Sequence, residues 1–172
     1  MSRFTSEIKR KGKWVGSGCE REAYLFQNKV FKISYSNSGL EQTEVEQNVY
    51  SSLPDRFKKF FPNPKWFGRV MVADFVDIYD KRGYQESEQF FQLDSTIYPH
   101  KFMDLLSRSN LGDLIAEIQA YDILPDLMDC LEYFDVAGCS IDDMIDNGGN
   151  FGVQDGQIKF VDWGVTSIDK EW

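Results

Sequence analysis

The first third of the chain alternates apolar and polar positions as antiparallel strands do. A strand at residues 13–15 leads into a Gly-Ser-Gly stretch at 16–18, and alternating runs at 22–26 and 30–34 flank a turn at 27–29. Short alternating runs bounded by turn residues are typical of half-buried strands. The pattern predicts a strand, a glycine-containing loop, and two further strands joined by a tight turn.

The next segment changes to a helical period. Val45, Val49 and Leu53 recur every four residues between positions 39 and 53, and Pro54 follows directly. Apolar side chains at this spacing lie on one face of an amphipathic helix, and a proline marks its end. We therefore expect a helix over residues 39–53.

The middle of the chain predicts more strands and then helices. An apolar run predicts strands at residues 65–70 and 71–76, and the polar stretch 77–100 is interpreted as loop and turns. Residues 100–138 are helical in two parts, with a break expected at 110–112. Strands in the first half followed by helices indicate an α+β fold with segregated elements.

The stretch NFGVQDGQIKFVDWG, residues 150–164, predicts a β-hairpin. The Asp-Gly pair at 155–156 is a strong two-residue turn signal between two short runs. A hairpin brings its ends together, so the side chains of Asn150 and Asp162 are expected to converge. Amide and carboxylate oxygens are ligands that suit Mg²⁺, which makes this point a candidate metal site.

Charge is distributed unevenly along the 172 residues. The net charge is −9, but residues 1–100 contain 15 Lys and Arg against 13 Asp and Glu, whereas residues 101–172 contain 4 against 15. An acidic surface repels phosphate backbones, so nucleic acid binding is not expected. The acidic half is either a solvated surface with carboxylates at a metal site, or a nucleic-acid mimic that blocks a basic partner. The basic cluster at 9–13 is interpreted as a solvated start.

Other bulk features point to the cytoplasm. No run of about 18 apolar residues is present, and the N-terminus lacks the apolar segment of a secretory signal. Cys19, Cys130 and Cys139 include no CxxC pair, which predicts reduced thiols. We expect a cytoplasmic protein without a membrane partner, forming one domain or two small lobes.

Lys32 lies in the apolar run 30–34, although a lysine is rarely buried without a partner. The following helix offers Glu44 and Glu46, and Glu46 is preferred because it lies beside the apolar face. A strand lysine paired with a helix glutamate can hold nucleotide phosphates. The glycines at 16–18 add a backbone that is able to approach an anion closely.

A glycine loop, a strand lysine, a helix glutamate, an asparagine and an Asp-aromatic-Gly motif follow one another in this order. Together they resemble the protein-kinase-like superfamily, most closely the small atypical kinases of bacteria and phages, including aminoglycoside-phosphotransferase-like members. The resemblance rests on GSGCEREAYLFQNKVFKI, EVEQNVYSSLP and NFGVQDGQIKFVDWG, with Trp163 in place of phenylalanine. It spans most of residues 14–164.

The resemblance implies one kinase-like unit with two lobes. Residues 1–78 would form an N-lobe, made of an antiparallel sheet with one helix, and residues 79–172 a reduced, mainly helical C-lobe that is truncated after the Asp-Trp-Gly motif. Its cofactors would be ATP and Mg²⁺. The implied binding residues are Lys32, oriented by Glu46, at the α- and β-phosphates; the backbone of Gly16, Ser17 and Gly18 over the phosphates; Ala73 and Phe75 in a hinge that reads adenine; and Asn150 and Asp162 as metal ligands.

The catalytic base departs from the family pattern. The family places an aspartate five residues before the asparagine, where this chain has Ile145. Asp143 and Asp146 are the two alternatives, and a third is that the chain has no base. A further departure is Arg21, which stands where a third glycine is usual.

Two main functions follow from the resemblance. The first is a minimal kinase-like phosphotransferase that binds Mg-ATP and phosphorylates a protein or a small molecule. The second is a pseudokinase-like phage or bacterial factor, acting in the host cytoplasm, that binds a host partner protein and inhibits or redirects it without phosphoryl transfer. A third interpretation is a plain acidic α+β protein with coincidental motifs.

Overall fold

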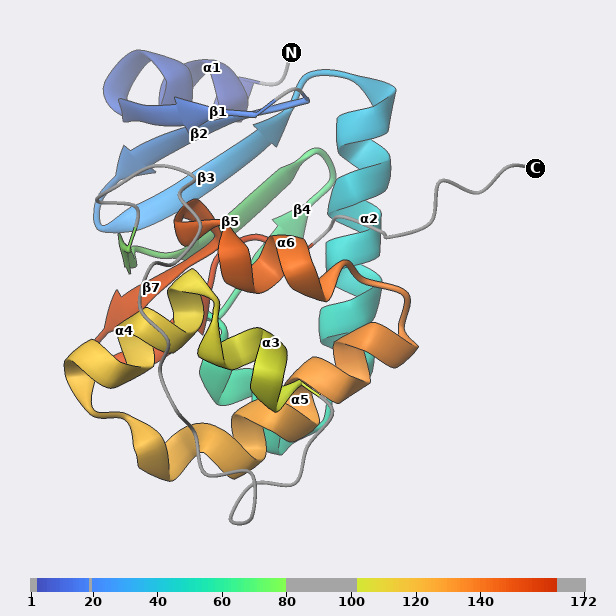
Figure 1. Cartoon of the computed structure of the whole chain (residues 1–172). Coiled ribbons are helices and arrows are strands. Elements are labelled where there is room, and N and C mark those ends of the chain that lie inside the picture. The colour runs from blue at the N-terminus through green and yellow to red at the C-terminus, as the bar shows by residue number, and fades with distance from the viewer. Residues whose placement is uncertain (1–2, 19, 80–101, 164–172) are drawn as a thin grey trace. The chain divides into compact units, whose positions relative to one another are not determined.

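The computed structural model describes residues 3–18, 20–79 and 102–163 (Figure 1). Contacts divide the chain into two compact units, Met1–Leu53 with Pro62–Phe75, and Pro54–Phe61 with Val76–Trp172. The chain therefore enters the second unit briefly at Pro54–Phe61 and leaves the first unit for the last time after Phe75, whereas the resemblance implied one boundary after residue 78. Each unit has its own sheet and helices.

The first unit is built on an antiparallel sheet with the strand order β1-β2-β3-β5-β4. The strands predicted in the first half of the chain are confirmed, and with the helices below they make the fold a mixed α+β fold. Their bounds are Lys13–Ser17 (β1), Arg21–Phe26 (β2), Lys29–Ser34 (β3), Lys65–Phe67 (β4) and Val70–Asp74 (β5).

The turn between β2 and β3 is as tight as predicted. Phe26 pairs with Lys29, so only Gln27 and Asn28 connect the strands, and their φ angles are 51° and 59°. Two successive residues in the left-handed region match the twist of a two-residue hairpin, and asparagine tolerates this region well. This turn fixes the register of β2 against β3.

Strand β3 sends its side chains alternately to two different helices. Phe31 and Ile33 are buried on one face, where they pack with Ile8 and Val70. Lys32 lies between them in the sequence and therefore points to the opposite face. The two faces of the sheet thus differ in chemistry, one being apolar and the other carrying a cation.

The apolar face is covered by α1 (Arg3–Lys11), a helix that the sequence analysis did not predict. Its Ile8 enters the core of the sheet, and Lys9 forms an ion pair with Glu22 of β2. Of the basic cluster interpreted as a solvated start, Arg10, Lys11 and Lys13 are exposed, whereas Lys9 is half-buried in this ion pair. The many charged side chains left too few apolar positions for the sequence analysis to predict this short amphipathic helix.

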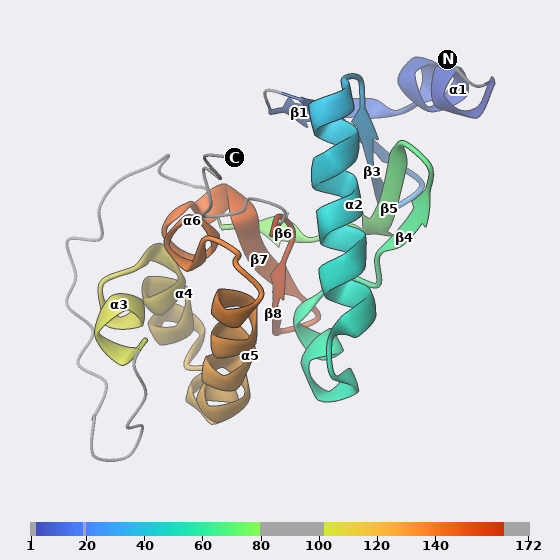
Figure 2. The same ribbon diagram turned by 90° about the vertical axis from the view of Figure 1, so that its right-hand side faces the viewer.

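The other face is covered by α2 (Asn37–Ser52), which runs along the sheet in both views (Figures 1 and 2). The Ser36 hydroxyl accepts a hydrogen bond from the Gly39 N–H and caps the helix. The predicted helix is confirmed, but its buried face is not the expected stripe, because Val45 is only half-buried. The buried residues of α2 are Gly39, Thr43, Glu46 and Val49.

The second unit combines helices with a small sheet of order β6-β7-β8. Its helices are α3 (Met103–Ser107), α4 (Asn110–Ile118), α5 (Leu124–Val136) and α6 (Ile141–Asp146), with short 3₁₀ helices at Asp55–Phe60 (η1), Tyr121–Ile123 (η2) and Gly148–Asn150 (η3). Its strands are β6 (Asp77–Ile78), β7 (Phe151–Gln154) and β8 (Gln157–Phe160). Of the stretch 77–100 interpreted as loop, residues 80–100 lie outside the described residues.

The break expected at residues 110–112 is wrong. Asn110 begins α4, and the hydroxyl of Ser109 caps that helix by accepting a hydrogen bond from the Gly112 N–H. A Cβ on Gly112 would lie 2.1 Å from the Leu106 carbonyl oxygen, so this glycine lets α4 pack closely against the backbone of α3. The breaks lie on either side of α4 instead, and Gln119 ends the helix with a φ of 55°.

The closing hairpin is confirmed. Gln154 pairs with Gln157, and the turn residues Asp155 and Gly156 have φ angles of 53° and 74°. The core beside it is aromatic, because Phe61 packs on Trp163 at 4.8 Å between ring centroids and on Phe134 at 5.6 Å. The residue after Asp162 is thus held in the core of the second unit.

Two bulk predictions are addressed by the structure. Cys130 and Cys139 are free, buried thiols, and burial raises the pKa of Cys139 to about 11. Cys19 lies outside the described residues. Within the described parts of the chain, no helix is both long and apolar enough to cross a membrane.

A glycine in β7 provides a test of the small sheet. A Cβ on Gly152 would lie 2.1 Å from the Asp77 carbonyl oxygen, so Gly152→Ala has to push β6 away. We expect a loss of about 1–3 kcal/mol in the free energy of unfolding, measured by urea denaturation. Gly16→Ala is the matched control, since nothing lies within 4 Å of a Cβ placed there. Equal stability of the two variants would contradict the close approach of β6 and β7.

Candidate functional site

The predicted site residues form two groups, one in each unit. Lys32 and Glu46 belong to the first unit, and Asp143, Asn150 and Asp162 belong to the second. Each group has its own geometry.

In the first unit, the structure brings Lys32 and Glu46 together. The Lys32 Nζ lies 3.7 Å from Glu46 Oε1, and the side chains are 13% and 0% exposed. Glu44, the alternative partner, is exposed on the other side of α2. Glu46 is therefore the acidic residue of α2 that contacts the strand lysine, as the sequence analysis preferred.

A second cation contacts the same carboxylate. The Arg21 Nη1 donates a hydrogen bond of 2.6 Å to Glu46 Oε2, and only 9% of the Arg21 side chain is exposed. Sequence reasoning noted Arg21 only as a missing glycine. The signal in the sequence was that Arg21 lies two residues before Ala23, which pairs with Lys32. Arg21 is therefore on the face of the sheet that carries Lys32.

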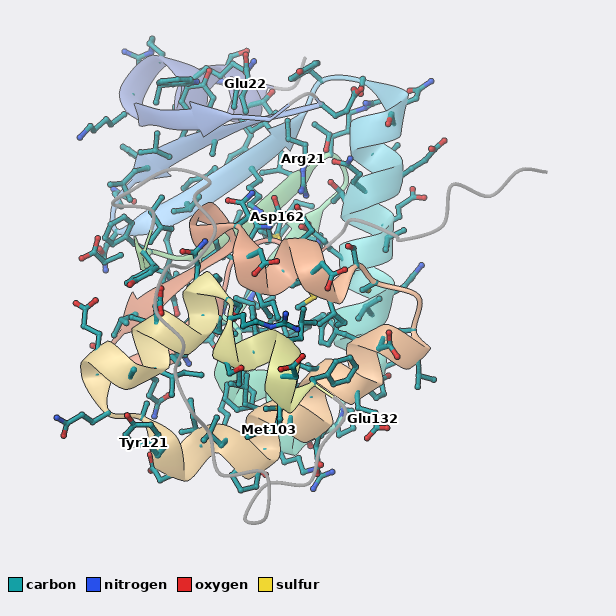
Figure 3. All side chains as sticks on the ribbon, in the orientation of Figure 1. Arg21, Glu22, Met103, Tyr121, Glu132 and Asp162 are labelled. Atoms are coloured by element: carbon teal, nitrogen blue, oxygen red, sulfur yellow. The ribbon has the colours of Figure 1, made fainter. Side chains whose placement is uncertain are left out.

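The register of the sheet explains this cluster. Ala23 pairs with Lys32 and Arg21 pairs with Ser34, so Arg21 and Lys32 are diagonal neighbours on one face. Figure 3 labels Arg21 on the side toward α2 and its neighbour Glu22 on the side toward α1. We call Arg21, Lys32 and Glu46 the charge cluster.

Hydrogen bonds beside the charge cluster hold the first turns of α2 on the sheet. The hydroxyl groups of Ser34 and Thr43 lie 2.8 Å apart, and Ser34 Oγ also donates to the Gly39 carbonyl. Gly39 itself has no space for a side chain, because a Cβ would lie 2.4 Å from the Glu20 carbonyl oxygen. The position of Glu46 along α2 is therefore fixed by polar contacts and by close backbone packing.

The glycine stretch forms the end of the β1–β2 hairpin. Gly16 and Ser17 pair with Ala23 and Glu22, and the Gly18 N–H donates to the Arg21 carbonyl at 3.0 Å. Among the described residues, nothing lies within 4 Å of a Cβ built on Gly16 or Gly18. Local packing among the described residues therefore does not require glycine here.

The expected hinge lies where the chain leaves the first unit. Ala73 is buried in β5 opposite Val30, and Phe75 is the last residue of that unit. The N–H groups of Asp74 and Phe75 already donate to the carbonyls of Pro62 and Asn28. An adenine read by this segment would have to use backbone groups other than these two N–H groups.

In the second unit, the structure brings Asn150 to Asp143. The Asn150 amide nitrogen donates to the Asp143 carbonyl oxygen at 2.9 Å and to its carboxylate Oδ2 at 3.1 Å. Asn150 is buried at the end of η3, and its own carbonyl accepts from the Val161 and Asp162 N–H groups. The hairpin thus closes as predicted, and it places Asp162 beside Asn150 through the backbone.

Asp143 and Asp162 influence each other electrostatically. Partial burial and then the negative charge of Asp162 raise the pKa of the Asp143 carboxyl, while the hydrogen bond from Asn150 opposes that rise. Figure 3 labels Asp162 next to α6, the helix that carries Asp143. The two carboxylates and the amide form what we call the acidic cluster.

Asp146 has a different environment. It is the last residue of α6, and its backbone carbonyl accepts a hydrogen bond from the Asn110 side chain. The contacts with Asn150 involve Asp143 and not Asp146. Of the two aspartates left open by the sequence, Asp143 is thus the one that the structure joins to the asparagine.

The donor set of the acidic cluster fits a hard divalent cation. Asn150 uses its amide nitrogen toward Asp143, and the charge of Asp162 acts on the same Asp143 carboxyl. In the described segments, no group of three or more His, Cys, Asp or Glu side chains is gathered that could hold a metal ion. The amide oxygen of Asn150 and the carboxylate of Asp162 are ligands that suit Mg²⁺, which keeps several water ligands and takes few from the protein.

No protein-family model, curated protein or solved structure matches the chain. The kinase-like family and its function therefore remain predictions from the residues.

The carboxylate pair predicts how stability depends on pH in the absence of a cation. Because the folded state raises the pKa of Asp143, it holds that proton more tightly than the unfolded chain does, so stability falls as the pH rises above about 4. Asp143→Asn removes this cost. We expect the variant to be more stable than wild type at pH 7 and to lose that advantage at pH 3, measured by urea unfolding in EDTA.

The control for this prediction is Asp142→Asn, since Asp142 is an exposed neighbour on α6. It should leave the difference between pH 7 and pH 3 unchanged. The repulsion between Asp143 and Asp162 is contradicted if Asp143→Asn destabilises the protein at pH 7 and not at pH 3.

Proposed function

We propose that this chain is a minimal kinase-like phosphotransferase that binds Mg-ATP and phosphorylates a protein or small-molecule acceptor. The observation that carries the proposal is the acidic cluster. Two carboxylates held close together cost stability, and a buried amide fixes one of them in place. Groups arranged at such a cost are typical of sites whose ligand repays it, here a divalent cation.

The charge cluster supports the nucleotide half of the proposal. It places two cations and one carboxylate together in a largely buried position. A strand lysine paired with a helix glutamate is the family's phosphate contact. Lys32 would meet the α- and β-phosphates, and the backbone of residues 16–18 would cover them.

The acidic cluster would supply the metal ligands and the base. Asn150 through its oxygen and Asp162 through its carboxylate would hold Mg²⁺, which neutralises charge on the phosphates when it is bound. Asp143 would accept the proton of the acceptor hydroxyl. The acceptor oxygen would then bond to the γ-phosphorus while the bond between the γ-phosphorus and the ADP oxygen breaks. A raised pKa suits this role, because a base works best near the operating pH.

Binding is tested by thermal shift with excess Mg-ATP, where saturation at about 100 times Kd stabilises the protein by about 2.7 kcal/mol. We expect Lys32→Ala and Asp162→Ala each to abolish most of that shift. Lys29→Ala on the same strand and Asp142→Ala on α6 are the matched exposed controls and should keep it. A wild type that shows no shift would contradict nucleotide binding.

Transfer is tested with γ-labelled ATP, alone and with host lysate. We expect Asp143→Asn to lower label transfer by about 10²-fold or more while the Mg-ATP thermal shift persists, because the base acts on the acceptor. Asp146→Asn should retain transfer, since Asp146 is not joined to Asn150. The opposite result would make Asp146 the base. Mg-ATP binding without any transfer would favour the pseudokinase-like alternative over this proposal.

A further inference from the structure

The charge cluster contains a buried carboxylate that one lysine could not both neutralise and leave for a phosphate. The Glu46 carboxylate is fully buried between α2 and the sheet, with 0% of its side chain exposed. A buried carboxylate needs a close, hydrogen-bonded cation, and removing its partner is strongly destabilising. If Lys32 were its main partner and turned toward a phosphate, the carboxylate would lose its principal neutralising charge.

The distances identify the main partner. Arg21 forms a direct hydrogen bond of 2.6 Å to one carboxylate oxygen, whereas Lys32 stands 3.7 Å from the other, which is beyond hydrogen-bond length. Arginine also keeps its charge at any accessible pH, and it suits buried ion pairs better than lysine does. Arg21 is therefore the hydrogen-bonded partner of Glu46, and Lys32 is the more distant second cation.

We propose that Arg21 is the positioning residue that holds Glu46 and fixes α2 on the sheet, while the phosphate contact is the role proposed for Lys32. The role of Lys32 rests on the proposed function, and the role of Arg21 does not. Arg21 occupies the position at which the family has a loop glycine. In this chain that position joins the end of the β1–β2 hairpin directly to α2.

Thermal stability separates the two cations. We expect Arg21→Met to lower the melting temperature by about 10 °C, because it leaves Glu46 without its hydrogen-bonded partner, while Lys32→Met lowers it by less than about 3 °C. The double variant Arg21→Met/Glu46→Leu removes both charges and should regain most of the loss. Equal losses from the two single variants, or a double variant as unstable as Arg21→Met, would overturn the proposal.

Failure of Arg21→Met to fold would count as the expected loss only if the double variant folds. If neither folds, the unpaired carboxylate is not the cause and the proposal is overturned. Arg21→Lys, which keeps the charge, should lose less stability than Arg21→Met. An Arg21→Lys variant no better than Arg21→Met would also count against a charge-based role.

Reactivity of Lys32 provides a readout that a merely structural Arg21 would not move. Without Arg21, Lys32 is the charge-cluster cation that remains beside Glu46, so its ammonium group should move into hydrogen-bond distance of the carboxylate and become less reactive. We expect acylation of Lys32 in Arg21→Met at pH 8, below its melting temperature, to be at least about threefold slower than in wild type, with Lys29 as the internal reference. An unchanged ratio of the two lysines would overturn the proposal.

These readouts need no nucleotide, so they are independent of the proposed function. If wild type fails to bind Mg-ATP, the phosphate role of Lys32 falls, and the melting temperatures and the lysine ratio still decide whether Arg21 holds Glu46. If wild type binds Mg-ATP but the two methionine variants are equally unstable, the inference about Arg21 falls alone.

Discussion

The buried carboxylate of Glu46 is the constraint on which the first unit depends. A charge with no exposure to water has to be met by cations at defined distances, so Arg21 and Lys32 must lie on the same face of the sheet. That face is set by the two-residue turn at Gln27 and Asn28, because a slip of one residue would turn every side chain of the strand over. Helix packing, strand register and charge placement thus have to agree for Glu46 to be buried beside its two cations.

In the second unit the comparable constraint is the Asn150 side chain. It is buried, and it donates to both the backbone and the carboxylate of Asp143. The hairpin then carries the chain back, so that Asp162 donates its N–H to the Asn150 carbonyl. Trp163 is held in the aromatic core by Phe61. The apolar core therefore fixes the residue beside the Asp162 carboxylate.

Local patterns in the sequence predicted those features that local patterns determine. The turn at 27–29 and the hairpin with its Asp-Gly turn follow from spacing over a few residues. The pairing of Lys32 with Glu46 followed from a lysine in an apolar strand and from a glutamate beside the apolar face of the next helix. The role of Arg21 did not, because a buried charge contradicts the rule that arginine is exposed, and only the pairing of β2 with β3 shows its partner. Helix α1 was missed for a similar reason, since one buried isoleucine among basic residues gives little periodicity.

The central proposal for the second unit is that the acidic cluster binds a divalent cation. Paramagnetic Mn²⁺ tests this most directly, because it broadens the amide signals of nearby residues in NMR spectra. The account predicts that Mn²⁺ selectively broadens the signals of Asp143, Asn150 and Asp162. Broadening spread over the exposed acidic residues of α5, with the signals of those three residues unaffected, would contradict it.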